Sequence, residues 1–417
     1  MNIFSGKDLT PTVMPLADTL VTENFGVRDG VLTVGGLAVD ELAEAFGSPL
    51  YVYDGDVIER RYRALTAALS GFADVYYSIK ANPNPSVARL LVEAGAGLEV
   101  ASGAELLIAE AAGASAGKIL FAGPGKGLHE LDLAIARGIG EIHVESFEEI
   151  NLAAELASAH GRVAKIAIRI NPSSAAQGGA MRMGGKPTAF GFDEETIGDV
   201  LAVVSVHPSL ELTGVHLFAG TQILDADVLH AQWAYGLKLA AAVAHAAGKT
   251  ALRIDLGGGL GIPYHDGDKP LDLGAVSAGA LRLSRERMGD PVLAASQILI
   301  EPGRYLTGPA GVYLSRVRAV KISRGQRFII GDGGMHHHLA ASGNLGQVIK
   351  RDYPIVAASL MANRDLSRAT VAGPLCTPLD TLGRQAHLPE MRAGDLLAIL
   401  QSGAYGLTAS PVGFLSH

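Results

Sequence analysis

Residues 75–85 have the sequence VYYSIKANPNP, in which Lys80 stands between an apolar run and two prolines. Tyr76, Tyr77 and Ile79 before it are typical of a buried strand, and the prolines after it end that strand. A lysine beside apolar residues most often lies at a surface with its amine in water. The role of Lys80 therefore depends on what the rest of the chain builds around the end of this strand.

Eight short apolar runs, of which this strand is the first, alternate with longer segments whose apolar residues recur at helical spacing. The runs are residues 75–79, 97–102, 119–123, 141–145, 165–170, 212–218, 252–257 and 298–303. Segments such as PSVARLLVEAG and SFEEINLAAELASAHG lie between them. Eight alternating strand and helix units predict an α/β fold, the parallel (β/α)₈ TIM barrel.

The two ends of the chain predict a second, mainly β domain. Residues 25–35 alternate around Asp29-Gly30, the dipeptide of a tight hairpin turn. After the eighth run, strand-like segments such as GVYLSRVRAVKI and QRFIIGDGG are separated by turn residues rather than by helices. The expected domains are an N-terminal segment of the β domain (1–48), the barrel (49–303) and a C-terminal β domain (304–417).

The composition favours an enzyme that acts on a small polar ligand. The chain has 417 residues and is 48% hydrophobic, and its 34 basic and 42 acidic residues give a net charge of −8. That balance provides no basic surface for nucleic acid or an anionic membrane. No run approaches the ~20 apolar residues that cross a bilayer, and the N-terminus has no secretion signal, so a cytoplasmic location is expected. With Cys376 as the single cysteine, an intrachain disulfide and a thiolate metal cluster are excluded.

Three strand ends suit a cofactor that carries a phosphate and an aldehyde. Because catalytic side chains of such barrels come from the carboxyl ends of strands, we expect Lys80, Gly257-Gly258-Gly259, and Glu301 with Arg304 on one rim. Glycine backbone N–H groups bind an anion without obstruction by side chains. A lysine amine forms a Schiff base with an aldehyde, and a carboxylate at a pyridine nitrogen keeps the ring protonated. The combination predicts pyridoxal 5′-phosphate (PLP), with Glu301 at the ring nitrogen.

Six blocks in chain order resemble the fold-type III PLP-dependent decarboxylases, the group that contains diaminopimelate and ornithine decarboxylases. The blocks are YYSIKANPNP, GVHLFAGTQ, RIDLGGGLGIPY, EPGRYLTGPAG, GPLCTPLD and SGAYG, which fall within about residues 45 to 415. The resemblance implies a PLP-binding barrel joined to a β domain of the alanine racemase and decarboxylase type. It also implies a homodimer with both active sites at the interface.

The resemblance further implies roles for individual residues. Lys80 resembles the Schiff-base lysine, and Glu301 resembles the partner of the pyridine nitrogen. Cys376 resembles the thiol, delivered from the neighbouring subunit, that reprotonates Cα after carbon dioxide leaves. Phe218 stands where relatives carry a histidine that stacks on the cofactor, and an aromatic face can still sandwich the ring. The residues that resemble phosphate and other cofactor contacts are Gly220, Thr221, Gly257, Gly258, Gly259, Arg304 and Tyr405.

Two departures from these relatives bear on the substrate. Thr377 follows the cysteine where diaminopimelate decarboxylases carry Glu and ornithine decarboxylases carry Asp, and a neutral hydroxyl cannot make a charge-assisted bond to an ammonium. Residues 331–344, GDGGMHHHLAASGN, lack the Arg and Tyr that hold a distal carboxylate in the diaminopimelate enzymes. We therefore expect a substrate with an uncharged or masked distal end. GGMHHH, AGPLCTP and SGAYGL resemble the butirosin-type subgroup, which decarboxylates a glutamyl group on an acyl carrier protein.

The three consecutive histidines of this stretch do not predict a metal site. Neighbouring strand residues point to alternate faces, so His336, His337 and His338 cannot all face one ion unless the backbone bends. We expect at least one of them to line the site or an interface. The candidate substrate contacts are Arg304, Thr377, His336 and His338.

Two other functions remain open. One is diaminopimelate decarboxylation in lysine biosynthesis. The other is amino-acid racemisation, which also uses a PLP-bearing barrel joined to a β domain. A racemase needs a second base, normally a tyrosine, opposite the lysine, whereas a decarboxylase needs an acid. Cys376 in its motif favours decarboxylation.

Overall fold

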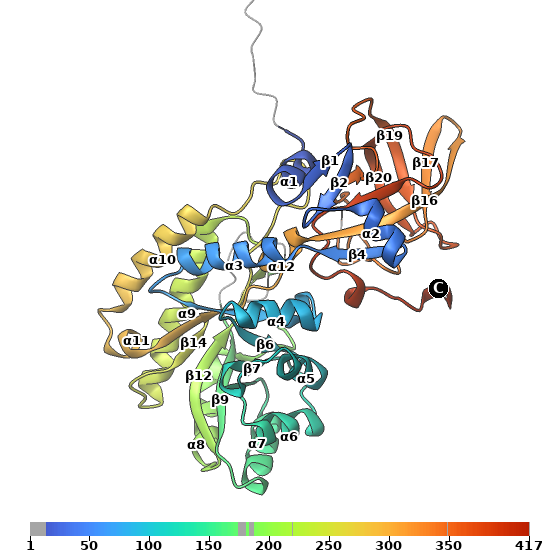
Figure 1. Cartoon of the computed structure of the whole chain (residues 1–417). Coiled ribbons are helices and arrows are strands. Elements are labelled where there is room, and N and C mark those ends of the chain that lie inside the picture. Colours follow the sequence, from blue (N-terminus) through green and yellow to red (C-terminus); the bar gives the residue numbers. More distant parts are fainter. Residues whose placement is uncertain (1–13, 174–180, 183–186, 219, 348, 417) are drawn as a thin grey trace, which may run out of the picture.

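The computed structural model describes residues 14–173, 181–182, 187–218, 220–347 and 349–416. It has two parts, a barrel and a β domain in which N-terminal elements lie among C-terminal ones (Figure 1). None of the helices in these ranges combines the length and the apolar character that crossing a bilayer requires.

Eight parallel strands close into a barrel, as the eight apolar runs predict. Around the barrel they are β5 (Asp74–Ser78), β6 (Gly97–Val100), β7 (Ile119–Phe121), β8 (Glu141–Val144), β9 (Ala164–Asn171), β12 (Leu210–Leu217), β14 (Arg253–Asp255) and β15 (Gln297–Ile300). The ring closes because β8 pairs with β9 and β15 pairs with β5. A further short strand, β11 (Phe192–Asp193), adds to β9 in parallel. The predicted TIM barrel is therefore confirmed.

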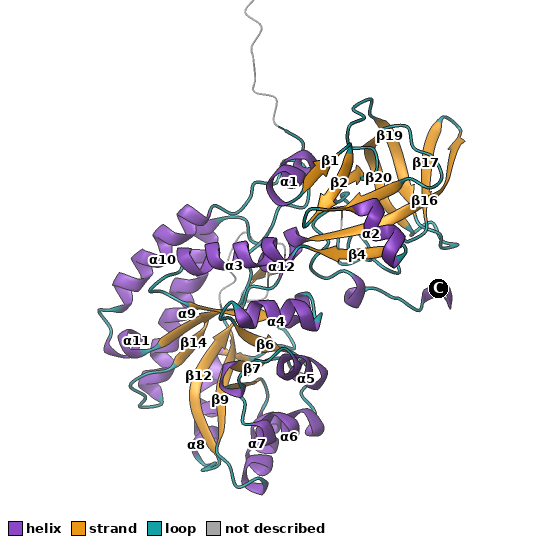
Figure 2. Ribbon diagram, in the orientation of Figure 1, coloured by secondary structure: helices purple, strands orange, loops and turns teal. Residues whose placement is uncertain are grey.

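Helices cover the outside of the barrel strands (Figure 2). They are α3 (Gly55–Ala68), α4 (Pro85–Glu93), α5 (Gly103–Ala111), α6 (Leu128–Arg137), α7 (Phe147–Ala159), α8 (Ile197–Ser205), α9 (Ala226–Ala246), α10 (Leu273–Arg287) and α11 (Pro291–Ala295). Several begin at capping residues that satisfy the free backbone N–H groups of the first turn. The Ser102 and Ser146 hydroxyls accept backbone N–H groups in this way at the starts of α5 and α7, directly after barrel strands.

The β domain is built on a seven-stranded sheet. Its strands are β4 (Leu50–Tyr53), β16 (Gly311–Ser323), β17 (Gln326–Gly331), β18 (Ile355–Ala357), β19 (Ser367–Ala372), β20 (Thr381–Leu388) and β21 (Leu396–Ile399). The first half of β16 pairs with β4 and β21, and its second half pairs with β17. The short helix α12 (Arg304–Thr307) connects this sheet to the end of the barrel.

The N-terminal elements pack against this sheet. They are α1 (Leu16–Asn24), β1 (Gly26–Arg28), β2 (Val31–Val34), β3 (Leu37–Ala38) and α2 (Val39–Phe46). β1 and β2 pair through the two-residue turn Asp29-Gly30, whose φ angles of 52° and 79° suit the predicted hairpin. Leu32 and Val39 share one buried cluster with Val312 and Leu396, so both ends of the chain build the β domain.

One strand bears on the expected domain bounds. β4 lies within the range expected for the barrel, yet it pairs with β16, with Tyr53 opposite Gly311 and Leu50 opposite Leu314. Its four residues, LYVY, are all partly buried. They show no alternation of buried and exposed positions that would assign the strand to the barrel or to the β domain. The bounds 49–303 and 304–417 stay a prediction, and α3 is the first helix that packs against the barrel helices α4 and α10.

Candidate active site

Lys80 lies in a single 3₁₀ turn, η1 (Ile79–Ala81), directly after β5. Its Nζ is 3.0 Å from each carboxylate oxygen of Glu99, in β6, and the Ser78 hydroxyl donates to the same carboxylate. Partial burial lowers the pKa of Lys80, but the Glu99 and Glu301 carboxylates outweigh it and hold that pKa above its ordinary value. The side chain is therefore an ammonium ion, and 46% of its surface is exposed.

The β domain holds the lysine turn in place. The Tyr405 backbone N–H donates to the carbonyl of Ala81 at 2.8 Å, and Asn82 Nδ2 donates to the carbonyl of Gly403 at 3.0 Å. The Tyr77 hydroxyl donates to the carbonyl of Asn82 at 2.8 Å. The SGAYG block thus fixes the position of the turn from the neighbouring domain.

The triplet Gly257-Gly258-Gly259 follows β14 and lies tightly against neighbouring backbone. A Cβ on Gly257, whose φ is +68°, would lie 2.6 Å from the carbonyl oxygen of Leu217. A Cβ on Gly258 would lie 2.5 Å from the carbonyl oxygen of Glu301. Real Cβ atoms do not approach so closely, so a side chain here would displace the ends of β12 or β15. The triplet therefore forms a wall of bare backbone, which suits an anion.

Phe218, Gly220 and Thr221 follow β12 and lie beside the triplet. A Cβ on Gly257 would be 3.1 Å from a ring carbon of Phe218, and one on Gly259 would be 2.9 Å from the carbonyl oxygen of Gly220. Gly220 and Thr221 form β13 (Gly220–Thr221), whose backbone pairs with β10 (Met181–Arg182). The structure thus brings the two predicted cofactor segments together.

Arg304 begins α12, close to Glu301 in the chain. Its Cζ lies 4.6 Å from the ring centre of Tyr405, and its Nη1 donates to the Tyr264 hydroxyl at 2.8 Å. The Tyr264 ring in turn packs on Tyr353 of the β domain, with 4.5 Å between ring centres. Arg304 and Tyr405 therefore lie beside the lysine turn.

Glu301 follows β15 and belongs to a buried polar cluster. His216 Nε2 is 3.4 Å from Glu301 Oε2, and ligating atoms of His143, His216, Asp255 and Glu301 all lie within 4.8 Å of one another. Burial raises the pKa of Glu301, but His216, Asp255 and Lys80 outweigh it and hold that pKa below its usual range. Burial and the adjacent Glu301 charge raise the pKa of Asp255. Glu301 is therefore the ionised member of the two carboxyl groups.

The residues present fit PLP on three observations. Glu301 Oε1 is buried and has no hydrogen-bond partner within the described part of the chain, which suits a donor such as a protonated ring nitrogen. The glycine triplet provides bare backbone for a phosphate. The Lys80 amine is exposed enough to reach an aldehyde.

The sequence patterns did not single out Glu99, His143 or Asp255. Each is a polar residue within a short barrel strand, and the three strands read GLEV, EIHV and RID. The signal that identifies them is a charged or histidine side chain at a position where a barrel strand otherwise carries apolar residues. These three side chains come together only because the barrel closes, and the local sequence of each strand does not reveal that closure.

Cys376 and Thr377 lie in the loop between β19 and β20. Cys376 is exposed, and Thr377 Oγ1 accepts the backbone N–H of Leu379 at 3.3 Å. The hydrogen bonds and ion pairs of the described residues link neither of them to Lys80. In a single chain, no hydrogen bond or ion pair of the described residues therefore joins the predicted catalytic cysteine to Lys80.

Asp380 joins the cysteine loop to the histidine stretch. Its Oδ1 accepts the backbone N–H of Met335 at 2.6 Å, and its Oδ2 accepts that of Leu375 at 2.8 Å. Both bonds are buried, and the Asn344 amide adds a third link by donating to the carbonyl of Leu379 at 3.1 Å. The two sequence blocks that depart from the better-known relatives therefore lie side by side.

His336 and His338 are both buried. His338 Nε2 lies 2.9 Å from the Ser402 hydroxyl, and the rings of Tyr51, Tyr313 and Tyr353 pack around it. Burial lowers the pKa of His338 to about 3, so its imidazole is neutral. The substrate contacts expected of these histidines stay predictions, because His338 has no exposed surface in this chain.

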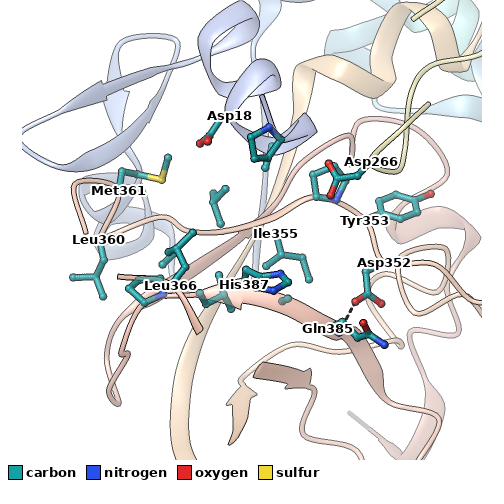
Figure 3. A pocket seen from close by; sticks show the side chains of 18 of the residues that line it. Asp18, Asp266, Asp352, Tyr353, Ile355, Leu360, Met361, Leu366, Gln385 and His387 are labelled. Atoms are coloured by element: carbon teal, nitrogen blue, oxygen red, sulfur yellow. Dashed lines mark hydrogen bonds between the residues drawn. The ribbon is translucent and has the colours of Figure 1, made fainter. Parts of the chain in front are cut away.

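A cavity of about 390 Å³ lies outside this site, between α1 and the β domain (Figure 3). Apolar side chains such as Ile355 and Met361 line it together with Asp18 and Asp352. Asp352 accepts the Gln385 backbone N–H at 2.8 Å. Tyr264, which binds Arg304, also lines the cavity, so the cavity and the Arg304 side chain share one wall.

Known proteins resemble this chain over most of its length. Residues 55–308 match the family model described as pyridoxal-dependent decarboxylase, pyridoxal binding domain. L-glutamyl-[BtrI acyl-carrier protein] decarboxylase of Niallia circulans is 41% identical over 382 residues, which cover 91% of this chain and 89% of that protein. Diaminopimelate decarboxylase of Aquifex aeolicus is 33% identical over 387 residues, covering 92% and 88%. The crystal structure of diaminopimelate decarboxylase from M. jannaschii superimposes with a TM-score of 0.84 at 28% identity, covering 94% and 90% of the two chains.

Proposed function

The chain belongs to the pyridoxal-dependent decarboxylases, and we propose that its substrate is an α-amino acid whose distal end carries no free charge. The observation that carries this proposal is Thr377, a neutral residue at the position where relatives read a distal ammonium. A glutamyl group bound as a thioester to an acyl carrier protein is the favoured substrate, because thioester formation removes the charge of the distal carboxylate. The Niallia circulans relative is named for a group of this kind.

The positively charged side chains near residues 331–344 support a site in which no cation of the described residues is available to bind a distal carboxylate. Arg384 Nη2 donates to the carbonyl of Ser342 at 2.9 Å, and Lys350 donates to the Asn344 side chain. Arg351 lies 3.3 Å from Asp268. Each of these three positive groups already has a protein partner, and Arg384 Nη1, which makes no hydrogen bond within the described part of the chain, lies 3.7 Å from Asp352 Oδ1.

When bound, PLP supplies an aldehyde for a Schiff base with Lys80 and a protonated ring that withdraws electrons from the bond to the departing carboxylate. Lys80 is a nucleophile only after its ammonium loses a proton, and Glu99, 3.0 Å away, is placed to accept that proton. The ionised Glu301 carboxylate would accept a hydrogen bond from the protonated ring nitrogen and so keep that nitrogen protonated.

Other residues of the rim hold the cofactor in this proposal. The backbone of Gly257-Gly258-Gly259 and of Gly220 and Thr221 binds the phosphate together with Arg304. Phe218 would hold one face of the ring, and Tyr405 lies against Arg304 beside the lysine turn. Arg304 is also kept as a candidate substrate contact, because it adjoins both the cofactor wall and Tyr264.

We further propose a homodimer in which Cys376 of one subunit completes the site of the other and reprotonates Cα. Cys376 is exposed, and exposed apolar side chains lie on the same or adjacent segments, with Leu379 50% and Ile349 78% exposed. Large exposed apolar residues next to a reactive thiol suit a surface that a second subunit covers. The cytoplasmic location stays an expectation.

Diaminopimelate decarboxylation is a second candidate, because relatives of that name match most of the chain at 32–33% identity. The racemase alternative gains no support, because the relatives described above are decarboxylases.

Product analysis distinguishes the two decarboxylase candidates. Purified protein with PLP is incubated with L-glutamate loaded on an acyl carrier protein, with free glutamate and with free meso-diaminopimelate, and the amine products are identified by mass spectrometry. We expect loss of carbon dioxide from the carrier-bound group, and none with the Lys80→Ala variant. Efficient turnover of free meso-diaminopimelate by the unmodified protein would overturn the proposal in favour of the lysine pathway.

A further inference from the structure

A buried line of polar side chains runs across the barrel interior behind Glu301. His216 Nε2 lies 3.4 Å from Glu301 Oε2, and the His143 and His216 rings pack with 4.5 Å between their centres. His143 Nε2 lies 3.4 Å from Glu141 Oε1. The four side chains are at most 4% exposed, so water does not separate them from one another.

The His216 imidazole in this line is neutral. Burial lowers the pKa of His216 to about 4, which the Glu301 charge only partly offsets. A proton on His216 would also place a cation beside His143 and near Arg169, and both groups disfavour it. Neither ring nitrogen of His216 makes a hydrogen bond within the described part of the chain. A neutral imidazole carries a single N–H, and Nε2, 3.4 Å from Glu301 Oε2, is the nitrogen placed to donate it.

Glu141, at the far end of the line, has its own hydrogen-bond donor and a nearby arginine. Glu141 Oε2 accepts the Thr213 hydroxyl at 2.6 Å and lies 4.0 Å from Arg253 Nη1. Gly214 leaves the space for this carboxylate, because a Cβ there would lie 2.8 Å from Glu141 Oε2. Glu141 therefore has polar partners of its own at the far end of the line, Thr213 and Arg253.

We propose that His216, backed by His143, is a positioning residue for Glu301: it donates its Nε2–H to Oε2 and leaves Oε1 directed at the ring nitrogen of the cofactor. A neutral donor orients the carboxylate without cancelling its charge, whereas an imidazolium would compete with the ring for that charge. This inference rests on the assignment of Glu301 to the ring nitrogen.

The groups that face the Glu301–His216 pair come from several elements. They are Lys80 on η1, Glu99 on β6, His143 on β8, Arg169 on β9 and Asp255 on β14. Because these groups remain in a His216 variant, loss of the His216 donor alone raises the pKa of Glu301. The ring proton and the visible absorption band of the bound cofactor then change at a higher pH than in the unmodified protein.

The experiment titrates the visible band of the PLP-loaded protein from pH 5 to 8 in His216→Phe, His216→Gln and His143→Phe. His230→Phe is the matched control, because it removes a buried histidine of α9 on the outside of the barrel. We expect the unmodified protein and the control to share one pH profile, and the change of the band in His216→Phe to begin at a higher pH. In that variant, kcat should fall about tenfold to a hundredfold, the range for one hydrogen bond to a charged group. His216→Gln, which keeps an N–H donor, should restore most of both properties.

Distinct outcomes separate this inference from the assignment on which it rests. An unchanged pH profile and normal kcat in His216→Phe would overturn the inference, as would His216→Gln failing as badly as His216→Phe. If Glu301→Gln leaves the band and kcat unchanged, the assignment of Glu301 itself fails. If His216→Phe does not fold, His143→Phe decides, with a smaller shift expected in the same direction. A divalent metal bound at one equivalent per chain would also overturn the inference, because the ion would then take the oxygens of Glu301.

Discussion

Lys80 and Glu99 face each other from neighbouring strands of the barrel, with the ammonium 3.0 Å from both carboxylate oxygens. Glu99 is 1% exposed, and its carboxylate accepts hydrogen bonds from Lys80 and from the Ser78 hydroxyl. The pair holds the amine at the rim before any cofactor arrives. It also gives the lysine proton an acceptor when the amine turns into a nucleophile.

The first prediction concerns the attachment of the cofactor. Borohydride treatment of the yellow PLP-loaded protein should fix the cofactor on Lys80, because this amine lies on the same rim as Glu301 and the glycine triplet. Peptide mapping by mass spectrometry checks the site, and Lys80→Ala protein serves as the unlabelled control. A cofactor fixed on another lysine would contradict the assigned site.

Glu301→Gln should lower turnover far more than it lowers cofactor retention. The carboxylate sets the charge of the ring, while the glycine backbone and Arg304 hold the phosphate. Electrostatic groups of this type are typically worth about 10²–10³ in rate. The test compares kcat and the PLP dissociation constant of the variant with those of the unmodified protein. Turnover and PLP affinity that weaken by the same factor would indicate a structural role for Glu301.

Substrate choice should change at Thr377. Free meso-diaminopimelate, lysine and ornithine should be poor substrates, because a buried unpaired charge costs several kcal/mol, and each ~1.4 kcal/mol is tenfold in specificity. Thr377→Glu should raise kcat/KM for a diamino acid relative to the native substrate. Leu281→Glu, which adds the same charge to an exposed position of α10, is the control and should leave that ratio unchanged.

Mixed dimers test the proposed origin of Cys376. Lys80→Ala and Cys376→Ala proteins should each be nearly inactive, yet subunit exchange between them should restore about one quarter of the native sites, because half of the dimers carry one site with both residues. Activity after mixing, with unmixed samples as controls, measures this. No recovery despite proven exchange would place both residues in one subunit.

Acid should destabilise the β domain through His338. Its folded-state pKa of about 3 lies below the ordinary value of 6.5, so the neutral form contributes stability that is complete above pH 6.5 and is lost as pH falls toward 3. One such proton adds a slope of up to about 1.4 kcal/mol per pH unit to the unfolding free energy. His338→Gln should flatten the slope between pH 6.5 and 4 in urea titrations, whatever it does to stability at pH 8. An unchanged slope would show that other groups carry the acid response.

The barrel followed from the sequence because its evidence is local and repeated. Each apolar run gives one strand within a few residues of its expected bounds, as for β5 and β9. Lys80 and Glu301 could be placed on one rim by the same argument, since parallel strands present their carboxyl ends together. Asp29-Gly30 likewise specifies its hairpin by turn geometry alone.

What the sequence left out depends on contacts between distant segments. Glu99, His143 and Asp255 lie on three different strands, and only closure of the barrel gives them a common neighbour. His338 sits in a stretch that reads as a polar binding loop, but the packing of three tyrosines around it makes it part of the interior. The partner of β4 lies at the far side of the whole barrel sequence, so no local pattern assigns that strand.

The pairing of β4 with β16 also sets an order of events during synthesis. The N-terminal hairpin, α2 and β4 leave the ribosome first, but the strand that β4 pairs with follows the last barrel strand. The barrel segment can therefore fold while the side chains of Leu32, Val34 and Val39 are not yet buried, because Val312 and Leu396, which pack against them, have not been synthesised. The β domain is thus the last part of the nascent chain to be completed, although its N-terminal strands are among the first to be synthesised.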